Sequence, residues 1–209
     1  KDRGGIEGRV WRPTAMPGRP CAIPEKRGDM AGTAEATEQL KTLPLERLHR
    51  QHGAQFGAFA GWNMPLRYAP GVMAEHLWCR EQAGLFDVSH MGQMILPAEA
   101  DEALERLVPV DVRGLGTGRQ RYALFTNAAG GIEDDLMIGR YEDGLHLVVN
   151  AARAEADAAR VAGQVPGAAL WTGQALLALQ GPAAEAALTR LVPGVASMRF
   201  MDVRRFDFE

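Results

Sequence analysis

Two adjacent aspartates, Asp134 and Asp135, follow a glycine pair and open an apolar run of the chain. Gly130 and Gly131 predict a tight turn, and the residues from Leu136 onward predict a strand that leaves it. Successive side chains on a strand point to opposite faces, so the two carboxylates should diverge, with only one able to aim into a pocket. We therefore do not expect a paired acid–base dyad here. An ordinary hairpin turn, which favours Asp and Gly for conformational reasons, would show the same residues.

Elements with alternating helical and strand patterns surround this segment from residue 43 onward. The spacing of apolar residues predicts helices over 43–51, 70–83, 98–108, 151–162 and 182–191, and strands over 85–96, 121–126, 136–141, 145–149 and 176–179. Gly84 is placed to cap the second helix at its C-terminus. Strands joined by short hairpins and mixed with helices predict an α+β fold, with helices packed on mixed or antiparallel sheets.

The composition is that of a globular chain and argues against several kinds of partner. The chain has 209 residues, a formal net charge of −3 and 46% hydrophobic residues, enough for one large domain or two small ones. No apolar run approaches the ~18 residues that cross a bilayer, and the basic residues do not gather on one predicted face. We expect neither a membrane nor a nucleic acid as partner.

The two cysteines, Cys21 and Cys79, predict neither a disulfide framework nor a zinc site, because their spacing fits no such pattern. This usage favours a reducing compartment, and we expect a cytoplasmic protein without a bound metal. Cys79 falls inside a helical pattern, where we interpret it as core filler.

The first 42 residues predict a disordered leader, and 43–209 the folded part. Residues 1–29 hold five glycines and four prolines without hydrophobic periodicity, and they lack the apolar middle of a signal peptide. Met30 would serve as a natural start, and residues 6–9 match a protease site used in expression vectors. Residues 1–29 are therefore open to interpretation as upstream translation or vector-derived sequence.

Six separated motifs carry a family resemblance. They are residues 59–68 (FAGWNMPLRY), 84–91 (GLFDVSHM), Tyr122 with Asn127, 130–136 (GGIEDDL), 148–151 (VVNA) and 180–182 (QGP). In this order they resemble the aminomethyltransferases, or T-proteins, of the glycine cleavage system. The resemblance implies a fold of three interwoven domains around a central folate channel, of which residues 43–209 match the N-terminal half to two-thirds.

The resemblance also implies a reaction and two partners. A lipoyl-bound aminomethyl group on the H-protein reacts with tetrahydrofolate, which is a substrate here, to give ammonia and 5,10-methylenetetrahydrofolate. Such chemistry needs a polar group that handles a proton and supports cationic intermediates, and a carboxylate suits this role. By motif position the resemblance assigns catalysis to Asp135, and to Asp134 a structural or outward-facing role.

Further positions are assigned to substrate binding by the same resemblance: Met91, Tyr122, Met137 and Asn150. Each also has an ordinary interpretation, since a strand-ending asparagine satisfies its own turn and a tyrosine or methionine beside a strand usually packs in the core. His90 titrates near neutral pH, yet a hydrogen-bonded architectural role is favoured for it. Trp62, Pro65 and Asp87 are interpreted as architectural.

Departures from the family pattern qualify the resemblance. The next family motif, Gly-Tyr-Thr-Gly-Glu, would follow shortly after Phe208 and is absent from this sequence. The chain stops at Glu209, at the end of a strand-like stretch over 203–208. We therefore expect a truncated chain that lacks the later folate-binding arginines and the C-terminal barrel, and that is inactive alone. At Gly139 some family members place a tyrosine against the folate.

Two alternative functions stay open. One is a related folate-dependent demethylase or the C-terminal portion of a dimethylglycine or sarcosine dehydrogenase, although residues 1–42 are too short for the flavin domain of such a dehydrogenase. The other is a folate-binding paralogue that assists iron–sulfur cluster assembly. That paralogue typically lacks the runs at 61–65 and 87–91 that are present here.

Overall fold

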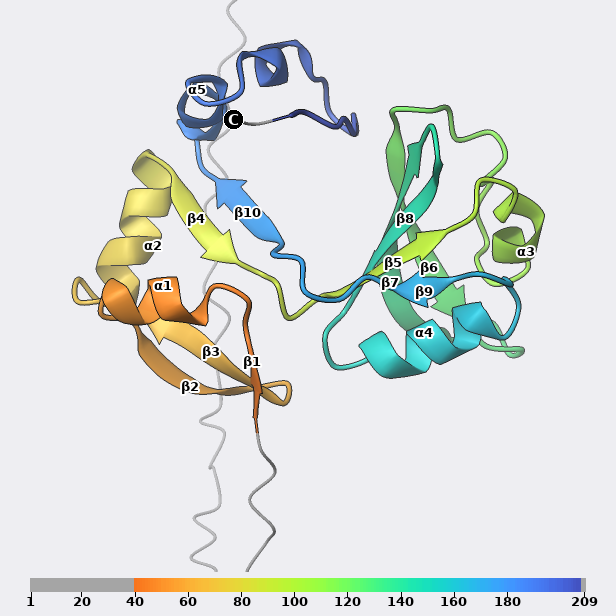
Figure 1. The fold of residues 1–209 in the computed structure, drawn as a ribbon, viewed down its shortest axis with the longest axis horizontal. Coiled ribbons are helices and arrows are strands. Elements are labelled where there is room, and N and C mark those ends of the chain that lie inside the picture. Colours follow the sequence, from red (N-terminus) through yellow and green to blue (C-terminus); the bar gives the residue numbers. More distant parts are fainter. Residues whose placement is uncertain (1–39, 208–209) are drawn as a thin grey trace, which may run out of the picture. The chain divides into compact units, whose positions relative to one another are not determined.

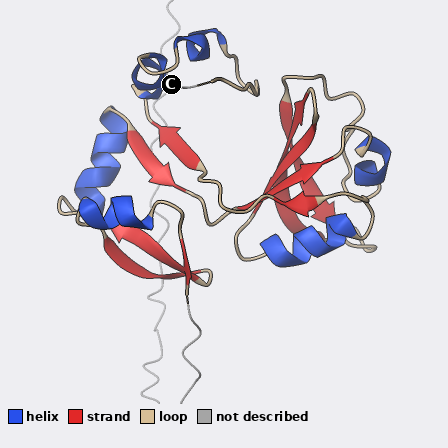
Figure 2. Cartoon of the chain, viewed as in Figure 1, coloured by secondary structure: helices blue, strands red, loops and turns tan. Residues whose placement is uncertain are grey.

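The computed structural model describes residues 40–207, which form helices and three small sheets (Figure 1, Figure 2). The helices are α1 (Glu46–Gln51), α2 (Val72–Glu81), α3 (Asp101–Glu105), α4 (Ala154–Ala162) and α5 (Ala184–Thr189), followed by the 3-10 helix η1 (Pro193–Ser197). The strands are β1 (Lys41–Thr42), β2 (Gln55–Phe59), β3 (Trp62–Arg67), β4 (Gly84–Asp87), β5 (Gly92–Leu96), β6 (Gln120–Thr126), β7 (Ile132–Tyr141), β8 (Gly144–Val149), β9 (Ala169–Leu170) and β10 (Leu177–Gln180). Within this part of the chain no helix is long and apolar enough to cross a membrane.

The main sheet has five strands in the order β6-β7-β8-β5-β9, and every neighbouring pair is antiparallel. Strands β6, β7 and β8 form a meander, because a turn at residues 127–131 and a two-residue turn after Tyr141 reverse the chain. Gly144, which ends the second turn, has φ of 153° and lies against the backbone of Leu96, where a side chain would collide.

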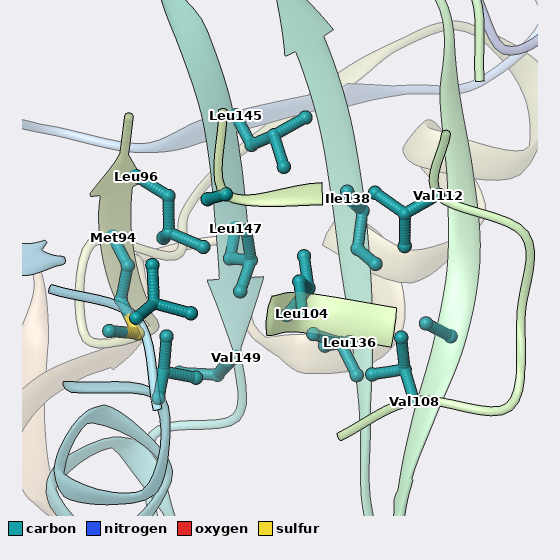
Figure 3. Close-up of a cluster of buried hydrophobic side chains, with 14 of the residues drawn as sticks. Met94, Leu96, Leu104, Val108, Val112, Leu136, Ile138, Leu145, Leu147 and Val149 are labelled. Atoms are coloured by element: carbon teal, nitrogen blue, oxygen red, sulfur yellow. The ribbon is translucent and has the colours of Figure 1, made fainter. Parts of the chain in front are cut away.

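One face of this sheet carries the hydrophobic core. Alternate strand residues such as Leu136, Ile138 and Leu147 are fully buried there, and Leu104 of α3 packs among them (Figure 3). Helix α4 contributes Val161 to the same core. Alternation with a period of two places every second side chain on the opposite face, which α3 and α4 leave uncovered.

Two smaller sheets lie outside the meander. Strands β2 and β3 form an antiparallel hairpin through Ala60 and Gly61, which both have positive φ as a type I′ turn requires, and β1 pairs with β3 in parallel. Strands β4 and β10 pair antiparallel although 89 residues of chain, from 88 to 176, separate them. The main sheet is built entirely within that interval.

The α+β class with mixed or antiparallel sheets is confirmed, and all five expected helices are present in shorter form. The single strand expected over 85–96 is wrong. It breaks after Asp87, whose carboxylate accepts the Ser89 backbone N–H at 2.9 Å and turns the chain, so that β4 and β5 enter different sheets. Strands β2, β3 and β9 were not expected.

Three smaller expectations also change. Gly84 does not cap α2, which ends at Glu81; it begins β4 instead, packed against Cys79. The free thiol of Cys79 is only half-buried and lies outside the hydrophobic core, so the interpretation as core filler is wrong, and Cys79 packs between α2 and β4 instead. Residues 203–207 form no strand, and only an isolated bridge joins Asp202 to Arg119. Of the leader expected over 1–42, residues 1–39 lie outside the described part, whereas Lys41 and Thr42 form β1.

Candidate functional site

The two aspartates of β7 lie on opposite faces of the main sheet, as the strand pattern predicts. Asp134 is half-buried on the face that α4 covers, and Asp135 is exposed on the other. Asp134 therefore does not face outward, and a structural position fits it. Asp135 pairs in register with Leu124 of β6, so its carboxylate stands on the open face of the sheet.

Asn150 connects the two carboxylates. It directly follows β8, whose last residue Val149 is paired with Leu136, so Asn150 lies opposite Asp135. Its side-chain amide donates to Asp134 Oδ1 at 2.8 Å, to Asp135 Oδ1 at 3.1 Å and to the Asp135 carbonyl at 3.2 Å. One amide thus holds both acids from the end of the neighbouring strand.

A third acid, Asp157 of α4, lies beneath this group with 1% of its surface exposed. Burial raises the pKa of Asp157 to about 7. A hydrogen bond to Asp134 and the negative charge of Asp134 add to the rise. Burial also acts to raise the pKa of Asp134, but hydrogen bonds from Asn150, Asp157 and the Asp135 backbone outweigh it and hold that pKa below its ordinary value. Asp157 therefore keeps its proton to a higher pH than Asp134, up to about pH 7.

Helix α4 reaches this position because Gly92 of β5 has no side chain. A Cβ there would lie 2.8 Å from the Cβ of Ala154 and 2.6 Å from a methyl group of Val149. Four residues before Val161, Asp157 is on the same buried face of the helix as that core residue. The sheet and helix together leave almost none of Asp157 in contact with solvent.

The expected substrate-binding residues gather near Asp135. Tyr122 is directly paired with Met137 across β6 and β7, and both share the open face with Asp135. Tyr122 is 64% exposed, which overturns the ordinary interpretation of it as a core tyrosine. Met91 immediately precedes Gly92, which is paired with Val149, so Met91 lies beside the Asn150 end of β8.

The far end of this face is closed by the C-terminal segment. Val203 packs 3.5 Å from where a Cβ of Gly139 would stand, and its backbone N–H donates to the Gly118 carbonyl at 2.9 Å. Arg119 forms an ion pair with Asp202 next to it. The glycine at 139 is thus buried beneath Val203.

A second polar group, which the sequence did not reveal, is built on His49. Its Nε2 lies 2.7 Å from Asp87 Oδ2 and its Nδ1 lies 2.6 Å from the Tyr68 hydroxyl. The Asp87 side chain is 1% exposed, and these three residues line a cavity of about 700 Å³ together with apolar groups such as Trp78 and Phe86. Asp87 thus bonds to both His49 and the Ser89 backbone, which supports its architectural role, and Pro65 lines the same cavity.

His90 packs rather than hydrogen bonds. Its ring meets Phe59 edge to face at 5.7 Å, and its Nδ1 is buried with no partner among the described residues. Burial lowers its pKa, against the opposing charge of Asp87. The hydrogen bond expected for His90 is therefore wrong, and its ring contributes packing instead.

The arrangement around Asp135 can do acid–base chemistry on a flat ligand. The carboxylate is exposed and held by an amide, so it can accept a proton or stabilise a nearby cation, while Tyr122 and Met137 offer an aromatic and a thioether surface. Within residues 40–207 no cluster of three or more His, Cys, Asp or Glu is arranged to hold a metal ion.

Asp157 was the functional neighbour that the sequence analysis missed. A signal was present, since a charged residue stood among Ala154, Ala158 and Val161 on the apolar side of the predicted helix 151–162. His49 gave a weaker signal, because its helix is short and its partners are distant in sequence.

Comparisons with known proteins agree on one family. Residues 45–209 match the model of the GCVT N-terminal domain. The chain is 37% identical to an "Aminomethyltransferase, mitochondrial" of Dictyostelium discoideum, covering 81% of this chain and 45% of the relative. It is 42% identical to an "Aminomethyltransferase" of Rubrobacter xylanophilus, over 77% and 45% of the two chains.

A solved structure gives the same match. The crystal structure of the glycine cleavage system aminomethyltransferase T from Bartonella henselae is 45% identical with a TM-score of 0.69, covering 78% of this chain and 46% of that one. The chain thus spans about half the length of the relatives it matches.

Proposed function

The chain belongs to the GCVT N-terminal domain family, and from that premise we propose that the protein containing it is an aminomethyltransferase of the glycine cleavage system. It would transfer the methylene of a lipoyl-bound aminomethyl group on the H-protein to tetrahydrofolate, with release of ammonia. The relatives described above are named aminomethyltransferases, so the demethylase, dehydrogenase and iron–sulfur alternatives are not favoured. A cytoplasmic location stays a prediction.

The observation that carries this proposal is the exposed Asp135 carboxylate, held by the Asn150 amide at 3.1 Å on an open sheet face. A carboxylate fixed in this way is ready to take a proton from the folate amine or to stabilise the cationic aminomethyl carbon as it changes partners. Strand β7 and Asn150 at the end of β8 hold it, so the group does not depend on a mobile loop.

The same face supplies the proposed folate contacts. The exposed ring of Tyr122 would stack on the pterin or its benzoyl group, and Met137 across the strand pair would mould to it. Asn150 would hydrogen bond to the folate as well as to Asp135, and Met91 would line the same surface. These roles are proposals for the whole protein, with tetrahydrofolate as substrate and no metal assigned.

A reconstituted assay with the whole protein tests the function. Purified aminomethylated H-protein and tetrahydrofolate should give ammonia and 5,10-methylenetetrahydrofolate together, and omission of either should abolish both products. Free dimethylglycine is the control donor. Equal turnover with free dimethylglycine would overturn the glycine cleavage assignment and favour the demethylase alternative.

A further inference from the structure

The buried acid Asp157 has no use in the mechanism above, yet Asp134 and Asn150 connect it to the proposed catalytic group. Its carboxyl group touches Asp134, whose Oδ1 accepts the Asn150 amide at 2.8 Å. That amide also donates to Asp135 Oδ1 at 3.1 Å. A continuous chain of polar contacts therefore runs from α4 to the exposed carboxylate.

Both carboxyl groups of the buried pair carry an oxygen without a donor. While both groups are ionised, Asp134 Oδ2 and Asp157 Oδ2 are each buried without a hydrogen-bond donor in the described part of the chain. Two ionised carboxylates have only acceptors, so neither could satisfy the other. A single proton on one of them would supply the missing donor, and buried carboxyl pairs commonly hold one.

The cations nearby do not remove the need for that proton. Arg160, one turn further along α4, forms an ion pair with Glu133 of β7 and lies over the ring of Phe125. Arg153, at the N-terminus of α4, only partly offsets the burial of Asp157. A buried charge without a partner is costly, which leaves protonation as the favoured state.

We propose that Asp157 is a positioning residue of the site: it shares a proton with Asp134, and Asp134 in turn holds the Asn150 amide against Asp135. The protonated Asp157 carboxyl group donates a hydrogen bond to the Asp134 carboxylate, and this proton is not transferred to substrate. Asp134 keeps its negative charge, and with a hydrogen bond to each carboxylate oxygen its Oδ1 accepts the Asn150 amide in one fixed geometry. The kinetic part of this inference rests on the proposed function, and the protonation part does not.

Loss of the shared proton should loosen the site. Once Asp157 ionises, two like charges face each other in a buried space and the pair must separate or admit water. Asp134 would then move away from Asn150, and the amide would lose the acceptor that aligns it with Asp135. Turnover should fall at pH above about 7, where burial and Asp134 place the pKa of Asp157.

Kinetics of two variants in the whole protein separate positioning from simple packing. Asp157→Asn keeps the shape and an N–H donor for Asp134, whereas Asp157→Leu keeps the volume and removes the donor. We expect Asp157→Leu to lower kcat at least tenfold with a smaller change in KM for tetrahydrofolate, and Asp157→Asn to lower it less. The decline of kcat above pH 7 should be absent in Asp157→Asn. Equal losses in the two variants, or an unchanged pH profile in Asp157→Asn, would overturn the positioning role.

A measurement without turnover keeps this inference separate from the proposed function. Aspartate carboxyl groups labelled with ¹³C should show one resonance that titrates near pH 7 in the wild-type protein and is missing in Asp157→Asn. The variant Asp143→Asn, in the exposed β7–β8 turn, is the control and should leave that resonance in place. If every aspartate of the wild type titrates below about pH 5, the shared proton is absent and the inference is wrong, whatever the donor of the reaction proves to be.

Discussion

Replacement of Asp157 by asparagine should change the pH dependence of stability in a direction that the buried pair fixes. Asp157 has its pKa raised from 3.8 to about 7 in the folded protein. Between these values the folded state binds a proton that the unfolded state has released. The contribution of protonated Asp157 to stability is therefore complete below about pH 4 and is lost as the pH rises through 7. Asp157→Asn has no such proton to lose.

The size of the effect follows from the two pKa values. A rise of about three units corresponds to about 4 kcal/mol in total, of which roughly a third is lost below pH 5. About 2–3 kcal/mol should thus disappear from the wild-type protein between pH 5 and pH 8. The pKa of Asp134 is lowered, so the contribution of that acid changes only below this window.

Urea unfolding of both proteins at several pH values between 5 and 8 measures the effect. Every other titrating group is shared, so the difference in unfolding free energy between variant and wild type isolates Asp157. We expect that difference to shift by about 2–3 kcal/mol in favour of asparagine from pH 5 to pH 8. Two curves that stay parallel within about 0.5 kcal/mol would refute the buried, protonated state of Asp157.

Other changes test the site, the core and the cavity. Asp135→Asn should lower kcat of the whole enzyme by about 100-fold with little change in KM for tetrahydrofolate, because it removes the proton-handling group and keeps its shape. The control Asp143→Asn should match wild type, and an equal loss of kcat in that control would contradict the assignment of Asp135. Leu147→Ala should destabilise the fold by about 2–5 kcal/mol in urea unfolding, since Leu147 is fully buried, whereas the exposed Leu66→Ala should cost under about 1 kcal/mol. His49→Ala should cost about 3 kcal/mol by the same measurement, because the buried Asp87 Oδ2 loses its imidazole partner while Oδ1 keeps only the Ser89 N–H. A loss no larger than that of His52→Ala, an exposed neighbour, would show that the cluster is unimportant. A dye that binds exposed apolar surface should fluoresce strongly with this 209-residue chain, because Trp78, Leu85 and Phe86 are 63%, 65% and 47% exposed, and a Leu85→Lys variant should bind less.

The meander strands could be predicted from sequence because their signals are local. The alternation of apolar and polar residues and the glycine turn at 130–131 predict strands close to the observed bounds of β6, β7 and β8. The same alternation predicts that Asp134 and Asp135 point to opposite faces. The aminomethyltransferase motifs added the family. None of these signals depends on a distant part of the chain.

What escaped prediction depends on tertiary contacts or on local competition. Asp87 bonds to the Ser89 backbone and interrupts a stretch that otherwise has strand composition, so 85–96 became two strands. Asp157 acquires its character only when α4 packs over β7, and His49 only when Asp87 and Tyr68 are brought to it. Sequence spacing marks Asp157 only as a charged residue on the apolar side of its helix and does not identify the partners of either residue.

The pairing of β4 with β10 makes the main sheet an insertion. Residue 88 leaves β4 and residue 176 returns to β10 side by side: the Val88 N–H donates to the Leu176 carbonyl at 2.9 Å, and the Leu176 N–H donates to the Ser89 hydroxyl at 2.9 Å. The two ends of the insertion are thus joined, as in domains that tolerate being placed inside another. We expect the meander to form from local hairpins before the strand pair that spans 89 residues closes, because the long-range pairing has the larger loop-closure entropy cost. The proposed catalytic residues therefore lie within this insertion, whereas Asp202 and Val203, which close the far end of their sheet face, lie outside it.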